Sequence, residues 1–378
     1  MTRALSQCTN VESYLLERYE FRKNVVTSKT EWRSRGENTP FVEINDYFLN
    51  SVQRDLRKSD VDEGLSLRCL LNSDFVPEVD LFASYFMSLP ERGTGHIDEL
   101  AKTITTTKQD FWLTCFKKWL VASVACAVSP DVVNQQVLVL IGAQGIGKTT
   151  WLHKLLPSSL KGFMYSGYIN PTNKDTLTTL AENMYINLDE IGSFRQKDID
   201  SLKELITKPT IQVRRPYAVY AENYTRRASF MASVNHSGFL KDDTGTRRFL
   251  TFTTTSINYK HSVDMDAVYS EAYSLYESGY KYWFDAKEIE EIEENNAPYM
   301  DVSIEYDMVE KYFRPSDEGE DTLLLTATEI TQHLRRVAHL PFSNATVQKV
   351  GAALRAMNFK RVKRQGLYMY VVKPSPNL

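Results

Sequence analysis

The spacing of apolar residues predicts helices in the first third of the chain. Between Gln109 and Ala127, large and small side chains recur every three or four positions, which places them on one helical face that packs into a core. This face comprises Trp112, Phe116, Trp119, Leu120, Ser123 and Ala127. Pro90 and the run Arg92–Gly95 interrupt the pattern. We therefore expect a helical N-terminal region over residues 1–92 and a further helical segment over residues 93–130.

From Val132 onward the pattern changes to short apolar runs that lack a helical period. Gln136–Ile141, Met184–Leu188 and Ala228–Val234 are rich in apolar and β-branched residues, as expected for strands buried on both faces of a sheet. Helical segments lie between these runs. Residues 131–300 are therefore predicted to form an α/β core with a largely parallel sheet.

The last part of the chain has the pattern of two helices followed by a hairpin. Thr326 and Glu329 form a capping box that starts one helix, and Ser343 or Asn344 caps a second. Two strands then flank a tight turn at Gln365-Gly366. This order predicts a winged helix-turn-helix over residues 322–378. A linker over residues 301–321, made of a short helical link and the acidic loop Pro315–Asp321, is expected to join it to the core.

Composition and charge narrow the protein class. The chain has 378 residues, of which 42% are hydrophobic and 25% are charged, and its net charge is −3. These values are those of an ordinary folded protein. The longest apolar stretch, Trp119–Val128, is shorter than a membrane span of about 20 residues, and no secretory signal is visible. The four cysteines are scattered, so we expect a cytoplasmic protein without a membrane association or a structural zinc site.

The strongest chemical signal is a phosphate-binding loop. Residues 142–149 match G-x-x-x-x-G-K-[ST] at each fixed position, after a predicted buried strand and before a predicted helix. In such a loop, backbone N–H groups surround the phosphates, the lysine reaches the β- and γ-phosphates, and the threonine hydroxyl binds Mg²⁺. We therefore expect ATP and Mg²⁺ as cofactors, held by Gly142, Ala143, Gln144, Gly145, Ile146, Gly147, Lys148, Thr149 and Thr150.

Two carboxylates follow the second apolar run. Asp189 and Glu190 come directly after the strand Met184–Leu188, so they are predicted at the end of a central strand. Asp189 would hold Mg²⁺ together with Thr149, and Glu190 would polarise the attacking water as general base. An adjacent Asp-Glu pair is also a common solvated helix start.

Further polar residues follow the third run. Asn235 ends the strand and would sense the γ-phosphate, or it would act only as a turn former. Arg247 and Arg248 follow on a loop. Either guanidinium could neutralise charge on the transferred phosphoryl group as an arginine finger does, or the pair could simply be solvated.

Together these residues resemble the virulence-associated protein E family, which comprises ATPases of phages, plasmids and genomic islands related to superfamily-three helicases and the AAA+ class. The resemblance covers roughly Leu89–Phe252, and Thr246 stands where the family pattern has asparagine before the two arginines. It implies a hexameric homo-oligomer whose pore hairpin carries Arg214, Arg215 and Tyr217 against single-stranded DNA. A hairpin of this kind could also be only a solvated turn. Many relatives carry an upstream primase domain, so priming here would require a separate primase.

The C-terminal charge pattern indicates a second contact with DNA. From Thr331 to Leu378 there are nine Lys and Arg residues and no Asp or Glu. We expect duplex DNA to contact Lys349, Arg355, Lys360, Arg361, Lys363 and Arg364, with no acidic side chain nearby. A basic surface that packs on a sister subunit or a protein partner is the alternative.

The sequence therefore favours an ATP-hydrolysing, ring-forming replicative helicase of a mobile genetic element. Two other functions remain open. One is a non-translocating ATPase switch, such as a replication-initiator loader or a defence-related protein. The other is a DNA-binding regulator with a degenerate nucleotide site, against which the intact Lys148, Asp189 and Glu190 argue.

Overall fold

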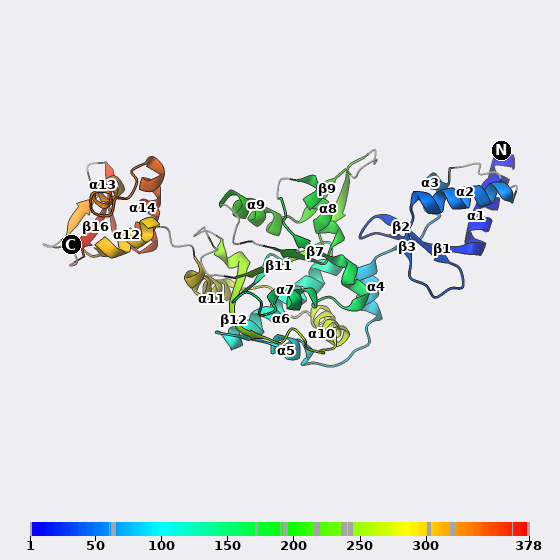
Figure 1. Cartoon of the computed structure of the whole chain (residues 1–378), viewed down its shortest axis with the longest axis horizontal. Coiled ribbons are helices and arrows are strands. Elements are labelled where there is room, and N and C mark those ends of the chain that lie inside the picture. Colours follow the sequence, from blue (N-terminus) through cyan, green and yellow to red (C-terminus); the bar gives the residue numbers. More distant parts are fainter. Residues whose placement is uncertain are drawn as a thin grey trace. The chain divides into compact units, whose positions relative to one another are not determined.

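The computed structural model divides the chain into two compact units, Met1–Tyr299 and Met300–Leu378, each with hydrophobic core residues of its own (Figure 1). It describes residues 2–59, 61, 66–170, 173–189, 191, 196–214, 220–235, 240, 245–300, 304–317, 319, 322–364 and 366–375. The fold is mixed α/β with several separate sheets, in agreement with the predicted class.

The first part of the Met1–Tyr299 unit contains a sheet that we did not predict. Its elements are α1 (Thr2–Arg18), β1 (Tyr19–Asn24), β2 (Lys29–Ser34), β3 (Val42–Glu43), α2 (Asp46–Lys58), α3 (Leu67–Leu70) and β4 (Glu78–Val79), with strand order β3-β2-β1-β4. Phe21 and Trp32, from the two long strands, both pack on Phe48 of α2. Charged residues of β1 and β2, such as Arg22 and Glu31, form ion pairs between the two strands. In the sequence, these residues look like the dispersed charge of a solvated helix. The helical prediction for residues 1–92 is therefore wrong in this part.

Helix α6 (Gln109–Val128) is the main core helix of this unit, and it follows α4 (Leu81–Ser88), α5 (His96–Ala101) and β5 (Ile104–Thr106). The six residues predicted on its packing face are all buried. Among the described residues it is the one helix long and apolar enough to span a membrane. It is longer than the apolar stretch Trp119–Val128 on which the sequence analysis relied. Because 72% of its apolar window is buried inside the protein, its composition is that of a core helix.

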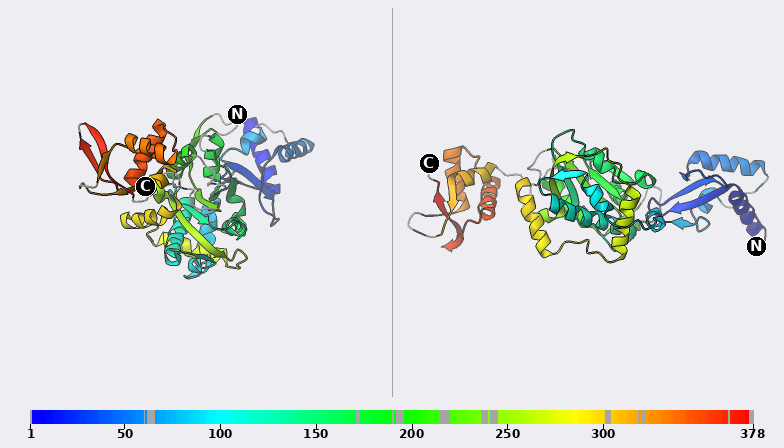
Figure 2. Two further views of the ribbon diagram at one scale, coloured as in Figure 1. Left: turned by 60° about the vertical axis from the view of Figure 1, so that its left-hand side comes forward. Right: turned by 90° about the horizontal axis from the view of Figure 1, so that it is seen from below.

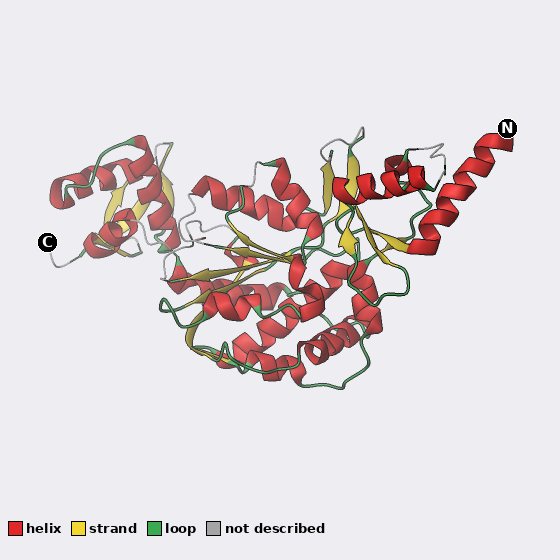
Figure 3. Cartoon of the chain, turned by 45° about the vertical axis from the view of Figure 1, so that its right-hand side comes forward, coloured by secondary structure: helices red, strands yellow, loops and turns green. Residues whose placement is uncertain are grey.

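The central sheet has six strands in the order β5-β12-β6-β11-β8-β7, all parallel except β5. Helices cover both faces (Figure 3). The strands after β5 are β6 (Val137–Ile141), β7 (Met164–Gly167), β8 (Tyr185–Leu188), β11 (Ser229–Val234) and β12 (Phe249–Ile257). Thus β6, β8 and β11 confirm the three predicted strands within one or two residues.

The remaining elements of this unit connect or follow these strands. They are α7 (Lys148–His153), the 3₁₀ helix η1 (Ser158–Phe163), α8 (Lys174–Glu182), α9 (Gln196–Thr207), the hairpin of β9 (Thr210–Val213) and β10 (Glu222–Thr225), the 3₁₀ helix η3 (Thr246–Arg248), α10 (Met265–Glu277), α11 (Ala286–Asn296) and the 3₁₀ helix η4 (Ala297–Tyr299).

The Met300–Leu378 unit begins earlier than predicted. Its elements are α12 (Ile304–Tyr312), β13 (Phe313–Pro315), β14 (Leu323–Leu325), α13 (Ala327–Ala338), α14 (Asn344–Ala356), β15 (Arg361–Arg364) and β16 (Leu367–Pro374) (Figure 2, orange and red). Val309 and Phe313 belong to its core, so the predicted linker over residues 301–321 is wrong for most of its described length. The capping box at Thr326 and the cap at Ser343 are confirmed. Strand β16 pairs with β13, β14 and β15.

Candidate functional site

The loop Gly142–Thr149 connects the end of β6 to the start of α7. Strand β6 lies between its parallel neighbours β12 and β11. The loop therefore leaves the sheet at the carboxyl end of an internal strand. In α/β proteins, ligands bind outside this edge, where connections to neighbouring strands diverge. The predicted strand–loop–helix context is therefore confirmed.

Three glycines give the loop a shape that other residues would not allow. A Cβ on Gly142 would lie 2.6 Å from the Thr254 hydroxyl and 2.8 Å from the Thr254 carbonyl oxygen. Gly147 has a φ of +97°, and its Cβ would lie 2.2 Å from the Tyr259 ring. Gly145 has a φ of +83°, which L-residues rarely adopt, although the space around it is open. The two ends of the loop, at Gly142 and Gly147, thus pack closely against neighbouring residues, whereas its tip at Gly145 has open space around it.

The ammonium group of Lys148 lies inside this loop. It donates hydrogen bonds to the carbonyl oxygens of Gly142 at 2.7 Å and Ala143 at 2.9 Å, and to Asn235 Oδ1 at 3.0 Å. Lys148 is only 5% exposed, and burial lowers the pKa of its ammonium group. Its partners among the described residues are all neutral oxygens, which leave the positive charge of the ammonium group without a counter-charge. The fold therefore brings together Lys148 and Asn235, which are 87 residues apart in the sequence.

Strand β11 contributes a second polar contact to the loop. The hydroxyl groups of Thr149 and Ser233 lie 3.0 Å apart. Ser233 was missed by the sequence analysis, yet it stands two residues before Asn235 and so projects to the same side of the strand. That period-two relation is the signal that could have identified it.

Asp189 lies directly after β8, and β11 separates β8 from the loop strand β6. Its carboxylate accepts hydrogen bonds from Asn187 Nδ2 at 2.8 Å and from the Ser166 hydroxyl at 3.3 Å. Ser166 is on the edge strand β7 and was also missed by the sequence analysis. The predicted general base Glu190 lies outside the described residues.

Arg247 and Arg248 lie at the amino-terminal ends of the strands, whereas the loop lies at their carboxyl ends. They belong to η3, immediately before Phe249, which pairs with Val137 at the first position of β6. From Val137 to Gly142 the chain advances by about 16 Å, at about 3.3 Å per residue. This is farther than an arginine side chain extends. The structure therefore does not bring either arginine to the phosphate loop of its own chain.

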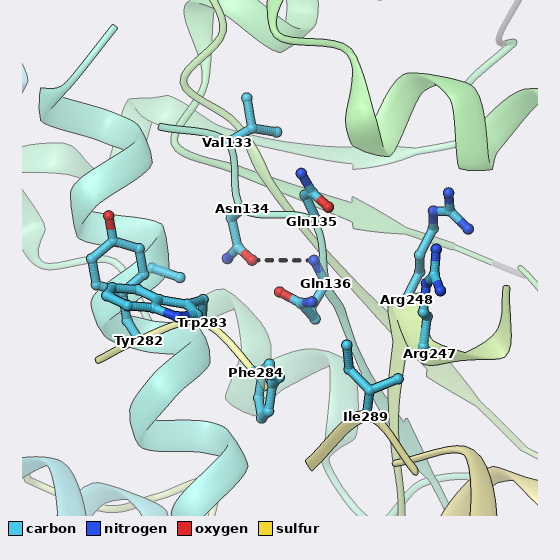
Figure 4. A pocket seen from close by; sticks show the side chains of 11 residues that line it. Val133, Asn134, Gln135, Gln136, Arg247, Arg248, Tyr282, Trp283, Phe284 and Ile289 are labelled. Carbon is cyan, nitrogen blue, oxygen red and sulfur yellow. Dashed lines mark hydrogen bonds between the residues drawn. The ribbon is translucent and has the colours of Figure 1, made fainter. Parts of the chain in front are cut away.

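Both arginines line a cavity of about 230 Å³ on the amino-terminal side of the strands. Its wall includes the amides of Gln135 and Gln136 and the ring of Trp283 (Figure 4). Burial and, secondarily, the charge of Arg247 lower the pKa of the Arg248 guanidinium. Among the described residues, no ion pair or side-chain hydrogen bond neutralises either guanidinium, so this pocket has the charge to accept an anion.

Of the predicted single-strand contacts, Arg214 is exposed directly after β9. Strands β9 and β10 pair in antiparallel register from Thr210–Thr225 to Val213–Glu222, which confirms a hairpin in this segment. Arg215 and Tyr217 lie outside the described residues.

The C-terminal basic residues have acidic neighbours, contrary to prediction. Lys349 Nζ lies 3.6 Å from Glu305 of α12, and Lys360 Nζ lies 3.0 Å from Asp317. Both acids lie before Thr331 in the sequence, outside the stretch whose charge was counted. The folding of the unit brings them next to the two lysines. The surface is therefore less positive than the sequence stretch suggests.

The hairpin strands of this unit combine cations with an exposed ring. The Arg361 guanidinium stacks 3.7 Å from the centre of the Tyr368 ring, and Lys363 Nζ lies 5.6 Å from the same ring. Arg364 is exposed at the end of β15, and Arg355 is exposed on α14. The structure thus gathers Arg361, Lys363 and Arg364 on one strand and leaves Lys349 and Arg355 on the preceding helix.

Solved structures share this fold. The chain is similar to the apo structure of the NrS-1 C-terminal region (305–718), with a TM-score of 0.52 and 13% identity over 99% of this chain and 100% of that one. A second form of the apo NrS-1 C-terminal region gives a TM-score of 0.51 and 14% identity over 97% and 99%. No curated protein sequence matches the chain. Residues 87–301, more than half of the chain, match the virulence-associated protein E-like domain. The chain therefore belongs to the virulence-associated protein E-like family.

Proposed function

We propose that this protein binds ATP with Mg²⁺, hydrolyses it, and uses the cycle to act on DNA during the replication of a mobile genetic element. The observation that carries the proposal is the loop Gly142–Thr149. A Cβ would collide at two of its glycines, Gly142 and Gly147. The loop surrounds a buried lysine with which no acidic side chain among the described residues forms an ion pair. Membership of the virulence-associated protein E-like family supports the link to mobile elements.

The residues present fit a bound nucleotide. Lys148 would exchange its bonds to the loop carbonyls for bonds to phosphate oxygens. The loop N–H groups would bind the same anion, as they do in phosphate-binding loops. Thr149 and Asp189 supply the oxygen ligands that Mg²⁺ prefers. Bound Mg²⁺ would neutralise the phosphate charge. Asn235, which accepts a hydrogen bond from Lys148, would sense the γ-phosphate, and Glu190, which follows Asp189, is the proposed general base.

The arrangement of the sheet supports an AAA+ type of ATPase. In the ATPases that the chain resembles, an acid ends one central strand and a γ-phosphate-sensing polar residue follows another, as Asp189 follows β8 and Asn235 follows β11, next to the loop strand β6. Arg247 and Arg248 lie at the ends of the strands opposite the phosphate loop. This position supports an oligomeric ring in which these arginines contact the nucleotide of a neighbouring copy. Finger arginines typically contribute about 10³–10⁵ to the rate of hydrolysis.

Mixing inactive variants tests this sharing. A protein with Arg247 and Arg248 replaced by alanine retains its loop, and a Lys148→Ala protein retains its arginines. We expect each to be inactive alone and their mixture to recover ATP hydrolysis at mixed interfaces. An inactive mixture of correctly assembled particles, or a fully active monomer, would contradict the shared site.

We propose two DNA contacts. The hairpin with Arg214 would contact a single strand in the pore, and the Met300–Leu378 unit would contact duplex DNA as a winged helix. In that unit α14 would enter the major groove, and the β15–β16 hairpin would lie along phosphates. The pairing of β16 with both β14 and β15 supports the winged-helix assignment.

Strand displacement with ATP is the decisive test. A helicase separates a forked duplex when ATP is present and fails with Lys148→Ala. ATP hydrolysis that DNA stimulates, without any strand separation, would instead favour a non-translocating switch. The absence of ATP binding by the wild-type protein would refute the whole proposal.

A further inference from the structure

A chain of hydrogen bonds connects the phosphate-loop helix to Asp189. His153 Nε2 in α7 lies 3.0 Å from the Ser166 hydroxyl oxygen on β7, and that hydroxyl lies 3.3 Å from Asp189 Oδ2. Asn187 completes the cluster, because its Nδ2 lies 2.7 Å from the Ser166 hydroxyl oxygen and 2.8 Å from Asp189 Oδ1. Three separate elements therefore converge on one carboxylate.

The direction of these bonds follows from the donors that each group has. An ionised carboxylate only accepts, and an amide NH₂ only donates. The single hydroxyl proton of Ser166 therefore goes to Asp189, and Ser166 accepts from Asn187. His153 Nε2 must then be a donor as well, so the neutral imidazole carries its proton on Nε2. The order of donation is His153 to Ser166 to Asp189.

The environment of Asn187 makes its orientation unambiguous. This side chain is fully buried, and Ser166 and Asn187 are register partners on the parallel strands β7 and β8. Turning the amide over would place its oxygen against Asp189, where two acceptors would repel each other. In the observed orientation Asn187 Oδ1 has no hydrogen-bond partner within the part of the chain that the structure describes. Burying an unsatisfied carbonyl oxygen costs free energy, which is offset here by the two bonds that its NH₂ group donates.

We infer that Ser166, with His153 and Asn187 behind it, is a positioning residue that holds the Asp189 carboxylate in the orientation required to bind Mg²⁺ with the nucleotide. This inference rests on the proposed function. Without the two donors, a carboxylate at the end of a strand rotates among several rotamers, and ordering it costs free energy when the metal binds. Because His153 lies on the helix that begins with Lys148 and Thr149, the same bonds also fix that helix relative to Asp189.

The relevant measurement is the binding of a fluorescent ATP analogue, not hydrolysis. For the full chain, its affinity is measured in EDTA and again over a range of Mg²⁺ concentrations. We expect Ser166→Ala to raise the half-saturating Mg²⁺ concentration about 10- to 100-fold, the range typical for groups that orient metal ligands. Affinity in EDTA should stay within about twofold, because the loop and Lys148 remain intact.

Conservative variants separate positioning from folding. Ser166→Thr keeps the hydroxyl, and His153→Gln keeps an N–H donor, so both should restore the Mg²⁺ response that Ser166→Ala and His153→Leu weaken. Ser159→Ala, at an exposed position of η1, is the matched control and should behave as wild type. His153 is itself exposed, so its variants should fold even if Ser166→Ala does not.

The outcomes are distinct. A Ser166→Ala or His153→Leu protein that folds and keeps the wild-type Mg²⁺ response overturns this inference and leaves the proposed function intact. Equal weakening in EDTA and in Mg²⁺ also overturns it, because the change would then be a general loss of structure. A wild-type protein that does not bind the analogue at all refutes the proposed function itself.

Discussion

Replacing Lys148 by alanine should separate nucleotide binding from folding. Lys148 is 5% exposed, and burial lowers the pKa of its ammonium group, so the folded protein gains little from holding this charge. Its hydrogen-bond acceptors are two carbonyl oxygens of a loop with an exposed tip and the Asn235 amide, which water can reach once the side chain is removed. We expect the free energy of unfolding without nucleotide to change by less than about 1 kcal/mol.

The effect on the nucleotide complex should be much larger. ATP at about 100 times its Kd stabilises a wild-type protein by about 2.7 kcal/mol. Each kcal/mol raises Tm by about 2 °C in a domain at the large end of the usual range. The Met1–Tyr299 unit of wild type should therefore gain about 5 °C with saturating Mg²⁺-ATP, and Lys148→Ala should lose nearly all of this gain.

Thermal unfolding with and without Mg²⁺-ATP measures both effects in one assay, with ATP hydrolysis followed in parallel. Lys154→Ala is the matched control, because Lys154 is an exposed lysine at the C-terminal end of the same helix. An equal Tm gain in Lys148→Ala and wild type would refute our assignment of the phosphate site. A Lys148→Ala protein that is several degrees less stable without nucleotide would refute the account of its burial.

Three further predictions test other parts of the molecule. Glu190→Gln should bind ATP as wild type does yet stall before hydrolysis, so near-normal turnover in a phosphate-release assay would contradict its role as general base. Asn134→Ala should lower the free energy of unfolding in urea by about 2–3 kcal/mol, because its buried amide NH₂ shares its two hydrogens among the Trp119 carbonyl oxygen and the hydroxyl oxygens of Ser123 and Ser229; a loss below about 0.5 kcal/mol would show that the network tolerates the change. In the Met300–Leu378 unit, replacing Lys363 and Arg364 with alanine should flatten the slope of log duplex affinity against log salt by about two; a folded wild-type unit without duplex affinity at low salt would indicate a protein-interaction module.

Features decided by a few neighbouring residues could be predicted from the sequence. The phosphate loop, the capping box at Thr326 and the cap at Ser343 each depend on bonds within about one helical turn. The three apolar strands were equally clear, because a strand buried on both faces needs an uninterrupted apolar run. These elements sufficed to predict where Lys148 lies relative to the sheet.

Features decided by distant residues could not be predicted. Nothing near Ser166 in the sequence indicates that it meets Asp189, since the contact depends on the register between β7 and β8. The neutralisation of Lys349 by Glu305 likewise requires the packing of α12 against α14. The N-terminal strands β1 and β2 were missed for a related reason: their charged residues pair across the hairpin rather than along a helix.

Strand β11 gives a physical reason why DNA contact and nucleotide state could be coupled under the proposed function. Its carboxyl end holds Ser233 and precedes Asn235, which contact Thr149 and Lys148. Its amino end follows the β9–β10 hairpin after only a short segment that contains Arg227. The Arg227 guanidinium is anchored by Asp80 at 2.6 Å and by the Ala127 carbonyl oxygen, so the strand is fixed at that point. Under the proposed function, β11 is therefore the element that connects a DNA-contacting hairpin with the phosphate loop, because its far end makes the contacts of Ser233 with Thr149 and of Asn235 with Lys148.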